Sequence, residues 1–164
     1  MAGIGFEVTI VGTEKLKTAL TKETITDPLA ESIKKITRFL LDEVKMATPV
    51  DEDILRASIT GKATPTWGQV GTNKNYSTFV EYGTRAHWPP IAPLEEWARR
   101  HGMPKGTGFL IARKISRVGT KAQHKEGALR VYGLGMFGYG MSKLQERIGE
   151  FIKDLGQAIK VKWG

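Results

Sequence analysis

The chain of 164 residues contains no cysteine. Disulfide bonds, thiolate zinc sites and cysteine nucleophiles are therefore excluded together. No apolar run approaches the roughly 18 residues that a membrane-spanning helix requires. The first seven residues carry neither a basic segment nor an apolar core, so we expect no secretory signal peptide. The apolar fraction of 40% and the charged fraction of 26% are typical of a globular domain.

Basic residues outnumber acidic residues by 25 to 17, which gives the chain a net charge of +8. Such an excess can bind nucleic acid, because lysine and arginine release the counterions of phosphates. Along the sequence, however, the cations are interleaved with acids and form no single block. A solvated basic surface is the simpler interpretation, and contact with DNA without sequence readout also fits.

The clearest helix signal begins at Asp27, a suitable N-cap, with Pro28 at the first helical position. Pro49 ends the pattern, since the residue before a proline is disfavoured in a helix. Between them, apolar residues recur at steps of three and four: Leu29, Ile33, Ile36, Leu40 and Val44. The pattern predicts a core helix of about 18 residues with one apolar stripe.

Strands and further helices are predicted on both sides of this helix. Alternating apolar residues predict a strand over 4–10, followed by a short helix over 14–20. Strands are predicted over 55–63 and 67–70. Residues 76–82 fit both a helix and a strand, and we favour a short helix or helical turn ended by Gly83. The later predicted elements are an extended loop over 85–91, helices over 93–101 and 109–118, a polar mobile segment over 121–127, a glycine-rich hairpin or loop over 128–141, and a last helix capped by Ser142.

No repeating βαβ order emerges, so we predict an α+β fold. In it, a small mixed or antiparallel sheet packs against the long amphipathic helix, with additional C-terminal helices. Residues 1–127 would form the core domain. Residues 128–164 would add a glycine-rich loop and an amphipathic helix that acts as a docking arm and orders on assembly.

No group of residues has the pattern of a catalytic or metal site. The three histidines stand in separate segments, and none has a second ligand at metal-binding spacing (His87, His101 and His124). The only acid cluster, over 51–53, suits turn and capping roles better than acid–base chemistry. We therefore expect a protein that is not an enzyme and that needs no cofactor.

Two patterns keep other functions open. Residues 133–138 match the Gly-x-Gly-x-x-Gly dinucleotide fingerprint, but the preceding residues are too polar for a buried central strand. A nucleotide-binding enzyme would use this loop. The helices over 93–101 and 109–118 could contact DNA, although their seven-residue connection exceeds the tight turn of a helix-turn-helix. A small DNA-binding protein using residues 93–118 is the main alternative.

Five short motifs occur in a fixed order in the middle of the chain: Pro49-Val-Asp51, Leu55 to Ile59, Val70-Gly71-Thr72, Tyr76, and Val80 to Thr84. This order resembles the neck or tail-component family of long-tailed bacteriophages, over about residues 4–95 and more loosely over 109–118. Members of that family often carry Asp-Thr-Gly after the proline, where this chain has Asp51-Glu52-Asp53. We expect the turn to differ, because Asp53 tolerates a positive φ less easily than glycine.

The resemblance implies a structural virion protein of the head-tail neck, active in tail completion or head-tail joining. It further implies a homohexameric ring around the DNA channel, assembled in the host cytoplasm, that binds head-closure or connector proteins and tail-terminator or tail-tube proteins. The residues expected to meet a neighbouring subunit or partner are Arg56, Phe79, Glu81, Tyr82, Gly83, Thr84, Arg85 and Trp88. Those expected at the DNA channel are Lys34, Lys35, Lys121 and Lys125.

Within this set, Glu81 requires a partner if it is buried, and Arg56 or Arg85 are the candidates. Phe79 or Tyr82 could anchor the segment in an apolar pocket. The sequence leaves open whether Glu81 and Tyr82 face the core of their own subunit or a neighbouring subunit.

Overall fold

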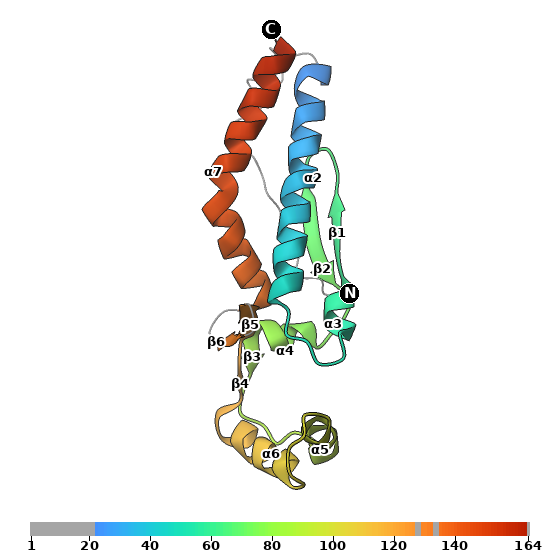
Figure 1. Cartoon of the computed structure of the whole chain (residues 1–164), viewed down its shortest axis with the longest axis vertical. Coiled ribbons are helices and arrows are strands. Elements are labelled where there is room, and N and C mark those ends of the chain that lie inside the picture. The colour runs from blue at the N-terminus through green and yellow to red at the C-terminus, as the bar shows by residue number, and fades with distance from the viewer. Residues whose placement is uncertain (1–21, 127–128, 133–134, 164) are drawn as a thin grey trace.

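Two long helices dominate the computed structural model, which describes residues 22–126, 129–132 and 135–163. Helix α2 (Lys22–Ala47) and helix α7 (Met136–Trp163) lie side by side along the long axis of the molecule (Figure 1). Among the described helices, none is both long enough and apolar enough to span a bilayer. The strand predicted over 4–10 and the helix predicted over 14–20 lie outside the described residues.

Helix α2 ends as predicted, at Ala47, two residues before Pro49. Its predicted start is wrong, because the helix already includes Lys22 and Pro28 lies inside it. The predicted apolar stripe is confirmed in its C-terminal half, where Leu40 and Val44 are fully buried. The local cap signal at Asp27 was therefore overridden by a helix that continues on its N-terminal side.

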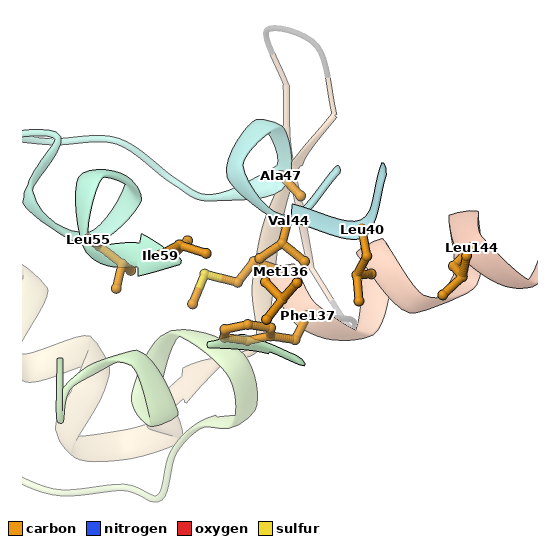
Figure 2. Close-up of a cluster of buried hydrophobic side chains, with 9 residues drawn as sticks. Leu40, Val44, Ala47, Leu55, Ile59, Met136, Phe137 and Leu144 are labelled. Carbon is orange, nitrogen blue, oxygen red and sulfur yellow. The ribbon is translucent and has the colours of Figure 1, made fainter. Parts of the chain in front are cut away.

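The hydrophobic core lies between α2, a hairpin of β1 (Ile59–Ala63) and β2 (Gly68–Thr72), and the first turns of α7. Figure 2 shows side chains of α2, α3 (Ile54–Ser58), β1 and α7 converging there, with Met136 among them. The buried members are Leu40, Val44, Ala47, Leu55, Ile59, Val70, Met136, Phe137 and Leu144. Residues from both sides of the boundary predicted at 127/128 thus share one core, and the docking role of residues 128–164 stays a prediction.

The strand predicted over 55–63 is correct only in its second half. Residues Ile54–Ser58 form the short helix α3, and β1 (Ile59–Ala63) follows. The difference begins at Asp53, whose φ of 62° starts a helical turn closed by the Ala57 amide donating to the Asp53 carbonyl. Strand β1 pairs antiparallel with β2 (Gly68–Thr72), and this hairpin packs on α2.

Helix α4 (Ser77–Tyr82) ends at Gly83, which confirms the short helix predicted there. The chain then forms β3 (Gly83–Thr84), which pairs antiparallel with β4 (Thr120–Lys121). Between these strands come an extended loop, as predicted, and the helices α5 (Ile91–Arg100) and α6 (Thr107–Val118). Figure 1 shows α5 and α6 packed together at the end opposite the C-terminus, joined to the body through the β3–β4 ribbon.

The segments around the last helix differ most from the sequence-based prediction. The predicted mobile segment over 121–127 instead contains β5 (Gln123–Glu126), which pairs antiparallel with β6 (Leu129–Tyr132). Helix α7 begins at Met136, six residues before Ser142. Although these boundaries were wrong, the α+β class is confirmed, with short antiparallel sheets, a long amphipathic helix and additional helices.

Candidate functional site

Helix α4 presents two chemically different faces. The Glu81 side chain is buried, with 6% of its surface exposed, whereas Phe79 and Tyr82 are 59% and 67% exposed. Ser77, one turn before Glu81, is also buried, as the spacing of a helix requires. Glu81 therefore faces the core of its own chain and Tyr82 faces solvent.

The partners of Glu81 are two backbone amides at the start of α7. Its Oε2 accepts a hydrogen bond from the Phe137 N–H at 2.8 Å, and its Oε1 accepts one from the Gly138 N–H at 2.9 Å. The arginine partners predicted for it are not used: Arg56 pairs with Asp53 at 2.6 Å, and Arg85 is exposed. The buried acid is thus compensated by a helix N-terminus.

The glycines around 135 explain why this contact is possible. The Gly135 carbonyl accepts the first bond of α7, from the Tyr139 N–H, so Gly135 is the N-cap residue. It has no side chain with which to cap the helix, and Glu81 supplies the missing acceptor to the second and third helical amides. A Cβ atom at Gly135 would collide with the Glu81 carboxylate.

This geometry answers the nucleotide-binding alternative. A helix N-terminus attracts anions because its amides are unpaired and its macrodipole is positive there. In this chain the anion is the carboxylate of Glu81, which already holds the amides that a phosphate would need. Of the fingerprint, the glycines that the structure describes, Gly135 and Gly138, therefore serve a contact within the chain.

Gly83 and Thr84 lie in the β3–β4 ribbon. Gly83 has a φ of 74°, and a Cβ atom there would collide with the Thr120 carbonyl; Gly119, with a φ of 68°, stands in the same relation to the Thr84 carbonyl. The hydroxyls of Thr84 and Thr120 lie 3.1 Å apart, and the Thr120 amide donates to the Thr84 hydroxyl. The two glycines let the strands approach at a point where any side chain would separate them.

The exposed aromatic residues that the structure describes fall into two groups. Tyr76, Phe79 and Tyr82 lie on α4 and the residue before it. Trp88, 54% exposed, packs edge-on against Phe109 of α6, with ring centroids 5.8 Å apart. Exposed aromatic side chains gathered in this way are typical of interaction surfaces.

Each acid of the cluster over 51–53 is paired with an arginine of the same chain. Arg100 of α5 bonds Asp51 at 2.7 Å and lies 3.4 Å from Glu52. The hydrogen bond to Asp51 holds the pKa of the Arg100 guanidinium above its ordinary value. Asp53 adopts a φ of 62°, although we expected it to tolerate a positive φ less easily than glycine, and its carboxylate accepts two hydrogen bonds from Arg56.

A second glutamate with a capping role was missed from the sequence. Glu95 of α5 accepts hydrogen bonds from the amides of Gly106 at 2.6 Å and Gly108 at 2.8 Å, and so caps α6. A Cβ atom at Gly108 would collide with the Glu95 backbone. The sequence signal was the pair of glycines at the helix start, which had been assigned to a linker.

The four lysines predicted at a DNA channel are not gathered in one place. Lys34 and Lys35 are exposed on α2, and Lys34 lies 3.7 Å from Glu31. Lys121 is exposed in β4, which follows α6 in the chain, and the Lys125 side chain lies outside the described part of the chain. Among the side chains that are described, no three histidine or acidic groups are placed to hold a metal ion.

Residues 13–83 match the family model described as "Bacteriophage HK97-gp10, putative tail-component". The matched range includes the ordered motifs from Pro49 to Gly83, and the resemblance to a phage tail-component family is confirmed there. The comparisons with curated proteins and with solved structures gave no match.

Proposed function

Because residues 13–83 match a phage tail-component family, we propose that this chain is a structural protein of the head-tail neck. It forms an oligomeric ring around the DNA channel and binds the adjacent connector and tail proteins during tail completion. The family match supports a place in the virion, contact with other virion proteins and a non-enzymatic role.

The observation that carries the proposal is the division of α4 into two faces. While Glu81 is bound to the start of α7, the opposite side of α4 presents Phe79 and Tyr82 to solvent. Exposing two large aromatic side chains is unfavourable for an isolated subunit, and aromatic residues dominate the energetics of protein interfaces. The outer face of α4 is therefore the surface we assign to a neighbouring subunit.

A closed ring needs two different surfaces on each subunit, because its contacts are heterologous. The first is the outer face of α4, together with Arg85 and Trp88 of the following loop. For the second, we assign the exposed side of α7, where Ile152 and Val161 are 63% and 82% exposed. We propose a hexamer on the basis of the resemblance described above.

The test compares Phe79→Ser/Tyr82→Ser with Val161→Ser in the full chain. Native mass spectrometry and electron microscopy of particles would measure ring formation alone and with connector or tail proteins. We expect the double variant to lose assembly while its thermal unfolding stays close to that of the unchanged protein. Assembly retained by the double variant would contradict the assignment of α4, and a monomer under all conditions, without partner binding, would contradict the proposed function.

Val161→Ser also examines the second surface. If it alone abolishes ring formation, the contact made by α7 is confirmed; if assembly persists, the second surface lies elsewhere. The stand-alone DNA-binding alternative predicts salt-dependent duplex binding by a monomer or dimer that forms no ring under any condition.

A further inference from the structure

The positive charge of the chain is concentrated in one part of the structure. Residues 85–121, which comprise the loop, α5, α6 and β4, contain eight lysines and arginines but only two glutamates, a net charge of +6. The rest of the chain holds seventeen cations against fifteen acids. The sequence pattern concealed this asymmetry, because the cations are spaced along the segment.

Helix α6 carries the centre of this charge. Its inner side, with Gly108 and Ala112 buried, packs against α5. Arg113, Lys114 and Arg117 lie at steps of one, three and four, so they share the outward side. All three are exposed, and α6 contains no acidic residue.

The cations on the outward side of α6 have no acidic partner among the residues that the structure describes. Of the two glutamates in the segment, Glu95 has both oxygens bound to the amides that start α6, and Glu96 lies 3.6 Å from Arg100. Arg113, Lys114 and Arg117 make no ion pair with any residue that the structure describes, and the same holds for Lys121 and Arg85.

Helix α2 carries three cations at the same spacing, but acidic residues lie beside them on the same helix. Lys34, Lys35 and Arg38 repeat the steps of Arg113, Lys114 and Arg117. Lys34 is paired with Glu31, and Asp42 follows one turn after Arg38. Acids on the same helix surface reduce the potential that an approaching polyanion would meet.

We infer that the outward face of α6, extended by Lys121, binds the phosphate backbone of duplex DNA without reading its sequence. Flexible, unpaired cations one helical turn apart can each neutralise a phosphate, and neutralisation releases counterions. The connection between α5 and α6 has six residues, longer than the tight turn of a helix-turn-helix. We therefore assign α6 contacts with phosphates and none with base edges. The inference rests on the proposed function only for the source of the DNA, the channel of the particle.

The test measures binding of a fluorescent duplex of mixed sequence to the full chain over a range of salt concentrations. The variant Arg113→Gln/Lys114→Gln/Arg117→Gln is compared with Lys34→Gln/Lys35→Gln/Arg38→Gln, which removes the same charge at the same spacing. We expect the α6 variant to make the slope of log affinity against log salt shallower by about 3, because each phosphate contact contributes about 0.9. The α2 variant should change the slope much less, and a second duplex sequence should bind equally.

Equal slopes for the two variants, or no duplex binding at low salt, would overturn the inference. Polyglutamate or anionic vesicles that bind as tightly as DNA, with the same loss in the α6 variant, would overturn the assignment to nucleic acid in favour of an acidic protein or a lipid surface. Ring formation by the α6 variant, measured separately, distinguishes a failure here from a failure of the proposed function. Unchanged thermal unfolding of both variants confirms that the comparison concerns folded protein.

Discussion

Two helices of this protein begin in the same way in very different surroundings. Helix α7 is capped by Glu81, which is 6% exposed, through amides at 2.8 and 2.9 Å. Helix α6 is capped by Glu95, which is partly exposed, through amides at 2.6 and 2.8 Å. At both helix starts a glycine leaves room for the capping glutamate: Gly135 for the carboxylate of Glu81, and Gly108 for the backbone of Glu95. The bonds are alike, so solvent access to the freed groups should determine how much each junction contributes to stability.

The largest effect is expected at the buried junction. Glu81→Ala removes two charge-assisted hydrogen bonds and leaves the Phe137 and Gly138 amides without a partner in the core. We expect it to lower the free energy of unfolding by about 4 kcal/mol, measured by chemical denaturation. Glu81→Gln, which preserves the size and one acceptor oxygen, should lose about half as much. A loss below about 1 kcal/mol for Glu81→Ala would remove the distinction between the two junctions.

The next largest effect is expected at a crowded glycine, in comparison with a glycine that has open space around it. Gly83 and Gly102 have positive φ values of 74° and 68°, but a Cβ at Gly83 would meet the Thr120 carbonyl, while nothing lies within 4 Å at Gly102. Gly102→Ala should cost about 1 kcal/mol, from backbone strain alone. Gly83→Ala should cost about 3 kcal/mol, because the β3–β4 ribbon must also open. Thermal unfolding measures both, and equal losses would show that the ribbon moves aside easily.

At the exposed junction, a smaller loss is expected. Glu95→Ala should lower stability by about 1 kcal/mol, because the hydrogen bond to the Gly106 amide is exposed and the one to the Gly108 amide is only partly buried, so water can replace much of what the carboxylate supplies. Hydrogen exchange at these amides should rise, while exchange at the start of α7 stays unchanged. Faster exchange at both helix starts would mean that the two junctions open together.

A third helix start, at α3, should give the smallest effect. Asp53, with a φ of 62°, is the only non-glycine among the described residues with a positive φ. Asp53→Gly relieves the backbone strain and loses only an exposed ion pair, so we expect a change within about 1 kcal/mol, in the stabilising direction. Asp53→Ala, which keeps a Cβ and loses the pair, is the control and should destabilise. If Asp53→Gly also lowered the free energy of unfolding, the lost ion pair would outweigh the relieved backbone strain.

Local patterns predicted the elements whose ends are marked by local chemistry. The C-terminal end of α2 near Pro49, the end of α4 at Gly83 and the end of α6 before Gly119 all follow from single residues. The apolar stripe of the last helix also runs further back than expected, through Met136, Gly140 and Leu144. A glycine stands at position 140 because Val44 and Leu40 approach there. Extending the period by two turns would have located the start of α7.

The remaining errors concern contacts between segments that are distant in the sequence. No local signal shows that Glu81 binds residues 137 and 138, and an acid within an aromatic segment suggested an arginine partner instead. The polar composition around residue 121 concealed β4, which forms because it pairs with β3, far earlier in the chain. Strand β5 was missed for a different reason, because it pairs with the neighbouring β6 in a local hairpin of polar sequence. The unpaired cations of α6 could not be recognised for a related reason, because the sequence shows where cations stand but not which acids are already engaged.

The cap of α7 also has a consequence for the order in which the chain folds. Its acceptor lies 56 residues before the first amide that it binds, so no local signal can fix where this helix begins. The entropy cost of closing a loop of that length must be met before the two hydrogen bonds of Glu81 can stabilise the fold. The contact is therefore non-local and should form late in folding. When only the first 130 residues have been synthesised, Glu81 is present, but the α7 amides that it binds have not yet been made. We therefore expect α4 and α7 to become protected from hydrogen exchange in the same kinetic phase, after the β1–β2 hairpin has packed on α2.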